Sequence, residues 1–341
     1  MKVYRVTSFT GENGLEQLEE ADPTAPVARQ VVVRVRANGI NFRDLIALDG
    51  HMQVVPPGMA KNHIPLCDGA GEIVSIGPAV TRFAVGDRVA FTFHPGWIAG
   101  PIPSDLNILG RSSGPNDGLL AEYSTVDESE LVTLPDHLSY EEGATLPCAG
   151  VTAWYALFGP AALLPGEEVL VMGTGGVALF ALQFAKMAGA RVIATTTSPS
   201  KMELLRELGA DAVIDASNGP GWHEGVLAAT GGRGVDVTVE VGGGGTWPDS
   251  GMATRNAGRM SLVGALSQST ENIPSMFMQR GIHNGPTRVG SRLHFEQMNR
   301  AIALHDLHPI IDRAFAFDDA KAAFEHFRSG VRVGKVVISN P

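Results

Sequence analysis

The apolar positions from residue 169 to residue 197 follow a strand pattern, then a helix pattern, then a strand pattern again. Residues 169–172 are apolar and β-prone, residues 173–176 read Gly-Thr-Gly-Gly, and residues 177–187 are apolar on nearly every face. A buried strand, a glycine turn and an apolar helix form the first half of a parallel βαβ unit. Residues 191–197 (RVIATTT) supply its second strand.

Short apolar strands and helices continue to alternate after this unit. Ser198-Pro199 fits a helix start with proline at the first helical position, and Gly209 fits the end of that helix. Strands at 211–215, 235–241 and 259–266 complete the pattern of a doubly wound parallel sheet, so the chain is of the α/β class. The remaining expected elements are an edge strand within 282–291, amphipathic helices over 295–304 and 317–327, and a closing strand in the GKVVIS segment that returns to the N-terminal part.

The first third of the chain has β-type patterning instead. Residues 3–9 fit a strand that pairs with another beyond the turn at 11–14, and residues 30–37 (QVVVRVRA) are rich in β-branched side chains. The segments 69–80 and 83–93 give two more strands with Gly-Pro and Gly-Asp turns. These glycine-rich, proline-punctuated strands predict a small barrel.

Residues 94–121 lack periodicity and are rich in Gly, Pro, Ser and Asn. Such a segment is either a mobile surface loop or a lid over a site, and His94 with Trp97 favours the lid. Strand character returns before residue 135. Ser139 then fits an N-cap, with acids in the first turn and an apolar helix over 144–158.

Length and composition exclude several classes of protein. The 341 residues, 44% of them hydrophobic, predict two domains with sizeable cores. A net charge of −10 with scattered basic residues argues against a nucleic-acid partner. Two cysteines cannot build a disulfide framework, the start MKVYRVTSF has no signal pattern, and no apolar run fits a membrane span. We therefore expect a cytoplasmic protein without a membrane partner.

The glycine turn predicts dinucleotide binding. In the G-x-G-x-x-G/A pattern, Gly173 permits the tight turn, Gly175 lets the backbone approach a pyrophosphate, and Ala178 lets helix and strand pack closely. The helix N-terminus offers N–H groups to the phosphate charge. The alternative is an ordinary glycine turn. The expected cofactor contacts here are Gly173, Thr174, Gly175, Gly176 and Val177.

The end of the second strand indicates which nicotinamide cofactor binds. NAD-binding proteins usually carry an acid there for the ribose hydroxyls, but this chain has no acid between Thr195 and Glu203. The hydroxyls of Thr196 and Ser198 and the charge of Lys201 can instead receive a 2′-phosphate. Lys201 could also be a solvated helix residue. The pattern favours NADPH, with NADP preferred over NAD.

Several separately spaced motifs carry a family resemblance over essentially the whole chain. Their order resembles the medium-chain dehydrogenase/reductase superfamily, most closely its zinc-independent, quinone-oxidoreductase-like branch. The resemblance implies a GroES-like catalytic domain (1–125 and 291–341), a Rossmann domain (126–290), and a homodimer joined through the 282–291 strands. The motifs are the barrel, the GDRV turn, LPCAGVTAW, GTGGVA, GADAVID and the terminal GKVVI.

The resemblance also bears on zinc. Zinc-dependent members have a Cys where this chain has Asn41, a His-Glu pair at Cys67-Asp68, and a Cys at Cys148, and their four-cysteine structural lobe is absent here. An amide at the Asn41 position is typical of the metal-free branch and is a poor zinc ligand, so no zinc is expected. Cys67, Asp68 and Cys148 could still supply three ligands. Alternatively, both cysteines are small buried hydrophobes.

Without a metal, catalysis depends on orientation and on hydrogen bonds to the developing oxyanion. Asn41 is the best candidate donor, because its amide can bond a carbonyl oxygen without titrating; the alternative is a helix N-cap. Asp44 is expected to order the loop and could pair with Arg43, and by resemblance Thr152 lies near the nicotinamide. No protonating residue stands out; His51, His63 and His94 are candidates, although each is more often a surface histidine.

Further cofactor contacts are implied by the resemblance alone. They follow the later strands of the sheet, and each glycine among them could equally be a plain turn. These residues are Val241, Gly242, Val263, Gly264, Val289, Gly290 and Ser291.

Three functions follow from these observations. The first is an NADPH-dependent reductase of a small-molecule quinone, enone or related carbonyl. The second is a zinc-dependent alcohol dehydrogenase that uses Cys67, Asp68 and Cys148. The third is a non-catalytic NADPH-binding protein.

Overall fold

The computed structural model describes residues 1–51, 61–113, 116–159, 161–264 and 274–341. The chain forms two compact units: unit 1 is Met1–Val151 with Gly290–Pro341, and unit 2 is Thr152–Val289. The sequence-based boundary at residue 126 was therefore too early, because β6 (Tyr123–Asp127), which contains this residue, and β7 (Leu131–Thr133), which follows it, both pair with the sheet of unit 1. Among the helices of the described ranges, none combines the length and hydropathy that crossing a bilayer requires.

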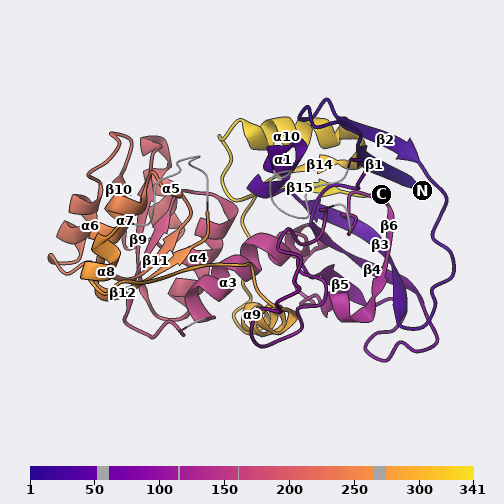
Figure 1. The fold of residues 1–341 in the computed structure, drawn as a ribbon, viewed down its shortest axis with the longest axis horizontal. Coiled ribbons are helices and arrows are strands. Elements are labelled where there is room, and N and C mark those ends of the chain that lie inside the picture. Colours follow the sequence, from indigo (N-terminus) through magenta and orange to yellow (C-terminus); the bar gives the residue numbers. More distant parts are fainter. Residues whose placement is uncertain (52–60, 114–115, 160, 265–273) are drawn as a thin grey trace. The chain divides into compact units, whose positions relative to one another are not determined.

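Unit 1 is built on a seven-stranded sheet in the order β14-β15-β3-β4-β5-β7, with β6 also paired to β3. The N-terminal and C-terminal parts of the chain lie side by side in it (Figure 1). A separate antiparallel hairpin, β1 (Lys2–Val6) with β2 (Leu15–Glu19), confirms the first predicted pair. The sheet strands are β3 (Gln30–Gly39), β4 (Asp68–Ile76), β5 (Arg88–Phe91), β6 (Tyr123–Asp127), β7 (Leu131–Thr133), β14 (Ile311–Ala316) and β15 (Lys335–Ser339).

The C-terminal tail completes unit 1, as the sequence predicted. Strand β15 pairs antiparallel with β3 and parallel with β14, whose mixed sequence IDRAFA had not been predicted as a strand. Helix α10 (Ala320–Arg328) starts later than residue 317, because Phe317–Asp319 forms a 3₁₀ turn. Phe324 packs in a fully buried apolar cluster with residues of α1 (Phe42–Leu48), β1 and β15. The other helix of the tail is α9 (Arg292–Leu304).

Unit 2 contains a six-stranded, wholly parallel sheet in the order β10-β9-β8-β11-β12-β13. The order reverses at β8, which confirms the doubly wound prediction. Strand β13 lies at one edge, and the homodimer expected through it stays a prediction. The strands are β8 (Glu168–Met172), β9 (Arg191–Thr196), β10 (Ala212–Asp215), β11 (Val235–Glu240), β12 (Thr254–Leu262) and β13 (His283–Pro286).

Short helices connect the strands of unit 2 and pack against its sheet (Figure 1). The helix predicted from Ser198 begins as a 3₁₀ turn, Pro199–Lys201, with Pro199 in its first position. Of the strand predicted over 259–266, residues 265–266 lie outside the described residues. The helices are α4 (Gly176–Met187), α5 (Met202–Glu207), α6 (His223–Ala229), α7 (Trp247–Ala253) and α8 (Met276–Gln279).

The helix predicted over 144–158 is divided into two pieces, and a short separate helix precedes them. Ser139 caps the short helix α2 (Tyr140–Gly143) as predicted. A π-helical turn, Leu146–Gly150, follows before α3 (Val151–Phe158). Pro147 lies at the start of this turn and has no backbone N–H, so it cannot make a regular α-helical hydrogen bond there.

Residues 94–121 are largely irregular, and their described part combines an exposed stretch with buried anchor residues. Trp97 is 1% exposed, and His94 is also buried. The Trp97 carbonyl accepts a hydrogen bond from the first residue of α9, and Arg111 is buried against Glu130. The segment is therefore packed into unit 1 through both backbone and side-chain contacts.

Gly264 provides a test of the packing in unit 2. A Cβ atom at this position would lie 1.8 Å from the carbonyl oxygen of Val241, and backbone atoms cannot yield as a flexible side chain can. We expect Gly264→Ala to lower the free energy of unfolding by about 3 kcal/mol or more, as measured by denaturant unfolding. Gly175→Ala is the control, because a Cβ there would meet open space and leave stability nearly unchanged.

Candidate functional site

Three strand ends and one helix start converge in unit 1. Strand β3 ends at Gly39, which pairs with Asp68 at the start of β4 and with Val337 in β15. Asn41 follows β3 directly as the N-cap of α1, and Lys335 is the first residue of β15. This register brings Asn41, Asp68 and Lys335 together, although they are far apart in sequence.

The three side chains form one buried hydrogen-bonded network. The Lys335 ammonium donates to the side-chain oxygen of Asn41 at 2.6 Å, to the Ile40 carbonyl at 2.9 Å and to Oδ2 of Asp68 at 3.2 Å. The Asn41 amide nitrogen donates to the same Asp68 oxygen at 2.8 Å. Lys335 is 2% exposed and Asp68 is fully buried, so each charge has its partner inside the protein.

This network fixes the orientation of the Asn41 amide. Its oxygen faces an ammonium group, which can only donate, and its nitrogen faces a carboxylate, which can only accept when ionised. One amide hydrogen is committed to Asp68, whereas the other points toward Cys67 Sγ at 3.6 Å. Because sulfur is a weak acceptor, this second hydrogen is the one that a carbonyl oxygen could take.

Asp44 and Arg43 order the loop around Asn41. One oxygen of Asp44 accepts the backbone N–H of Asn41 at 2.8 Å, and the other pairs with Arg43 at 3.0 Å. Arg43 also donates to the carbonyl of Leu109 at 3.0 Å. Asp44 therefore acts on Asn41 by positioning its backbone, as the sequence suggested, and the Arg43 pairing is present.

Burial perturbs the acids of this site. Burial raises the pKa of the Asp44 carboxyl to about 6, against the opposing effect of Arg43. It also raises the pKa of Asp68, which Lys335 and Asn41 act to lower, and it holds the pKa of the Cys67 thiol well above its usual value.

The two cysteines lie in the same neighbourhood. One ligand atom each of Cys67, Asp68 and Cys148 lies within 4.8 Å of the others, which is the donor set that a variant zinc site would use. The Asp68 carboxylate is at the same time bound by the Lys335 ammonium. Leu66, directly before Cys67, is fully buried with a φ of +68°, a conformation that costs about 1–2 kcal/mol in a non-glycine residue.

In unit 2, the glycine turn has the shape that a pyrophosphate requires. Gly173 has a φ of +76°, and a Cβ at Gly173 or Gly175 would meet nothing within 4 Å. Gly175 is the N-cap of α4, so the N–H groups of Gly176 and Val177 lie in its first turn. Ala178 is buried against the sheet. These residues fit a dinucleotide phosphate.

The turn after β9 lies close to this cradle. The Lys201 ammonium is 3.4 Å from the hydroxyl of Thr174, in the middle of the glycine turn. The hydroxyl of Thr196 accepts the backbone N–H of Ser198 at 3.1 Å, which holds the turn in shape. The positive charge of Lys201 is thereby placed next to the predicted phosphate-binding backbone.

The other residues predicted to contact the cofactor differ in their position and packing. Gly242 and Gly290 have packing reasons to be glycine, since a Cβ would come within 2.3 Å of Thr246 and 2.7 Å of Val151, respectively. Ser291 caps α9 in unit 1, whereas Thr152 is buried at the start of α3 in unit 2. Val241 and Val263 follow β11 and β12, and Val289, the last residue of unit 2, has a φ of +59°.

Sequence reasoning missed two residues. Lys335 was read only as part of a strand, although a lysine at the start of an otherwise apolar strand is a signal for a buried partner. Glu240, at the end of β11, is fully buried and accepts hydrogen bonds from the backbone of Gly242 at 2.6 Å and the hydroxyl of Thr246 at 2.7 Å. Glu240 therefore shapes the turn that carries the predicted Val241-Gly242 contact.

The expectation that three histidines lie at the surface holds for one of them. His51 is exposed, whereas His63 and His94 are each 3% exposed. The sequence around them gave no periodicity from which burial could be inferred.

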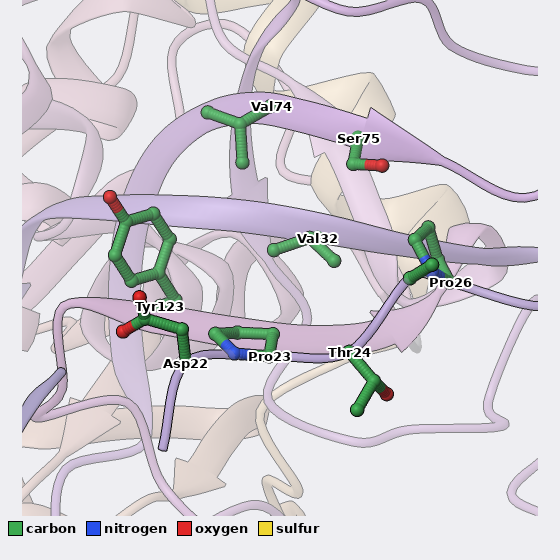
Figure 2. Close-up of a pocket in the computed structure, with 9 residues that line it drawn as sticks. Asp22, Pro23, Thr24, Pro26, Val32, Val74, Ser75 and Tyr123 are labelled. Carbon is green, nitrogen blue, oxygen red and sulfur yellow. The ribbon is translucent and has the colours of Figure 1, made fainter. Parts of the chain in front are cut away.

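A hollow of about 220 Å³ lies on one face of the unit 1 sheet, where residues 22–26, which include two prolines, lie beside β3, β4 and β6 (Figure 2). It shares no residue with the Asn41 network and holds no cluster of titratable groups. It is lined by Asp22, Pro23, Thr24, Ala25, Pro26, Val32, Val74, Ser75 and Tyr123.

The raised pKa of Asp44 predicts a pH dependence of stability. A carboxyl whose pKa rises from 3.8 to about 6 on folding binds more protons in the folded state than in the unfolded state. Its contribution to the free energy of unfolding is therefore present at low pH and is lost as the pH rises through 6. Between about pH 4.5 and pH 7, the free energy of unfolding of the native chain should fall by about 2 kcal/mol relative to Asp44→Asn. Denaturant unfolding of both proteins at several pH values measures this difference. The prediction is contradicted if the free energies of unfolding of the native chain and of Asp44→Asn change in parallel with pH.

Comparisons with known proteins agree with this architecture. Residues 27–136 match the alcohol dehydrogenase GroES-like domain, and residues 176–304 match the zinc-binding dehydrogenase family. A zinc-type alcohol dehydrogenase-like protein of Schizosaccharomyces pombe is 37% identical over 96% of both chains. A quinone oxidoreductase of Pseudomonas aeruginosa is 36% identical over 71% of this chain and 67% of its own.

A solved structure described as an alcohol dehydrogenase, from Sinorhizobium meliloti 1021, is 35% identical to this chain. It superimposes with a TM-score of 0.91, covering 99% of this chain and 98% of its own. The chain belongs to the medium-chain dehydrogenase/reductase superfamily and is an oxidoreductase of a family that uses a nicotinamide cofactor.

Proposed function

We propose that this oxidoreductase uses NADPH and reduces a quinone, an enone or a related carbonyl compound without a catalytic metal. The name of the P. aeruginosa relative supports the substrate class. The observation that carries the proposal is the buried network in which Lys335 and Asp68 hold the Asn41 amide.

The cofactor preference rests on the turn after β9. The turn contains no acid that would accept the ribose hydroxyls of NAD, and Lys201 lies 3.4 Å from Thr174 in the phosphate cradle. The ammonium group of Lys201, in the turn where an acid would bind the ribose hydroxyls, provides charge and hydrogen bonds for a phosphate on the adenosine ribose. Unit 2 therefore favours NADP over NAD.

The metal-free part of the proposal rests on charge. Asp68 Oδ2 already accepts hydrogen bonds from Asn41 and from the Lys335 ammonium. A zinc ion on this carboxylate would face the positive charge of Lys335 within the same buried pocket, and like charges at short distance repel strongly at low dielectric. The arrangement thus favours a hydrogen-bonding site over a metal site.

The chemistry assigned to Asn41 follows from its geometry. When bound, a reduced nicotinamide supplies a hydride to an electrophilic carbon. Asn41 can donate its second amide hydrogen to the oxygen of that substrate, where negative charge develops. Lys335, by binding the amide oxygen, polarises the amide and strengthens it as a donor. Asp68 keeps the nitrogen from rotating away.

A zinc-dependent alcohol dehydrogenase is the second candidate. The observation in its favour is that ligand atoms of Cys67, Asp68 and Cys148 lie within 4.8 Å of one another. This site would lack the histidine of zinc-dependent relatives, and it would have to displace the Lys335 contact to Asp68.

Substitution of Lys201 tests the cofactor assignment. With quinone and enone substrates, Lys201→Ala should raise the KM for NADPH by about tenfold to a hundredfold, because one charged hydrogen-bond partner of the phosphate is lost. The KM for NADH should stay within about twofold. Lys186→Ala is the matched control, since this lysine pairs with Asp211 at 2.8 Å and lies outside the turn.

Two outcomes of this experiment would contradict the proposal. If Lys201→Ala raises the KM for NADPH and the KM for NADH by the same factor, Lys201 does not contact the 2′-phosphate. Tight NADPH binding with no turnover of any quinone, enone or aldehyde would favour a non-catalytic NADPH-binding protein.

A further inference from the structure

Two histidines and two carboxylates gather on the surface of unit 1 and share no residue with the Asn41 network. His137 precedes α2, Glu142 lies in α2, and Asp306 and His308 follow α9. One ligand atom each of His137, Asp306 and His308 lies within 4.8 Å of the other two. The two imidazole rings meet edge to face, with centroids 5.1 Å apart.

The side chains of this cluster are already oriented by hydrogen bonds. Nδ1 of His308 lies 2.6 Å from Oε1 of Glu142, whose other oxygen accepts the backbone N–H of Ser139 at 2.8 Å. A carboxylate that takes the Nδ1 hydrogen sets the tautomer in which Nε2 carries the lone pair that a metal binds. Glu142 therefore acts on His308 as outer carboxylates act on metal-ligating histidines.

His137 is positioned in a similar way. Its Nε2 donates to the carbonyl oxygen of Leu307 at 3.2 Å and lies 4.0 Å from Oδ1 of Asp306, so an ion bound at Nε2 would replace the Leu307 contact. The side chain of His137 is 21% exposed and that of Asp306 is 81% exposed. One ligand is therefore held by its surroundings, while the carboxylate can move onto an ion.

The donor set selects a class of ion. Two imidazole nitrogens with a carboxylate suit divalent zinc, cobalt, nickel or copper, whereas magnesium and calcium prefer sites made wholly of oxygen. We propose that His137, Asp306 and His308 form an accessory site for a divalent transition-metal ion of the zinc class, with Glu142 orienting His308.

Such an ion would join two segments that are distant in the chain. Residue 137 leads into α2 and the π-helical turn that carries Cys148, whereas residues 306–308 lead from α9 into β14. An ion that binds both segments only in the folded state stabilises that state, and the stabilisation grows with the logarithm of the ion concentration above Kd. The site is thus a structural clamp within unit 1, independent of the proposed reductase chemistry.

Metal titration of the full chain, without an affinity tag and stripped of metal, tests this site. Isothermal titration with Co²⁺ should give saturable binding, and His137→Gln or His308→Gln should weaken it at least tenfold. His305→Gln is the matched control, because it changes an exposed histidine at the end of α9. Zn²⁺ should raise the Tm of the native chain and of His305→Gln, but not that of His308→Gln.

The same titration separates this site from the buried cysteines. The Co²⁺ spectrum should lack a sulfur-to-cobalt charge-transfer band, and Cys67→Ser should leave the affinity unchanged. The proposal is overturned if Co²⁺ does not bind saturably, or if binding survives both histidine substitutions. The proposal is also overturned if Co²⁺ binds only at the cysteines. In that case the native chain would show a sulfur-to-cobalt band, and Cys67→Ser would show neither the band nor any Co²⁺ binding.

Discussion

The buried ammonium group of Lys335 holds together the part of unit 1 on which the proposed chemistry depends. It binds the Asn41 oxygen, the Asp68 carboxylate and the Ile40 carbonyl, and so ties the end of β3, the start of β4 and the start of β15 at one point. Two opposite charges buried together are tolerated because each satisfies the other. Removal of one partner from such a pair costs about 3–5 kcal/mol, since the remaining charge is left without compensation.

The contact of Lys335 with the Asn41 oxygen explains why this chain has an amide where, by the family resemblance, zinc-dependent members have a metal-binding cysteine. An amide has both an acceptor and donors, so it can bond Lys335 with its oxygen and Asp68 with its nitrogen. A thiolate at this position would place a second negative charge beside Asp68. Asn41, Asp68 and Lys335 therefore depend on one another, and Asp44 fixes the loop that carries Asn41.

Local signals were sufficient for much of the fold. The glycine turn, the Ser139 cap and the short apolar strands predicted the wholly parallel sheet and the start of α2 from neighbouring residues alone. Strand β14 was missed because its two charged residues, Asp312 and Arg313, are adjacent and break the alternation of apolar and polar positions, so that only its pairing with β15 reveals it. Asn41 was singled out by its residue type and by the family resemblance, but its link to Lys335 spans 294 positions and depends on the β3–β15 register. No local pattern contains that information.

We propose that this chain transfers a hydride without a catalytic metal. The most direct test measures metal content and turnover on the same sample, with NADPH and a quinone or enone substrate, before and after chelation. We expect full turnover to persist after chelation has lowered the metal content to far less than one ion per chain. Turnover that is lost on chelation, restored by Zn²⁺ and abolished in Cys148→Ser would contradict it.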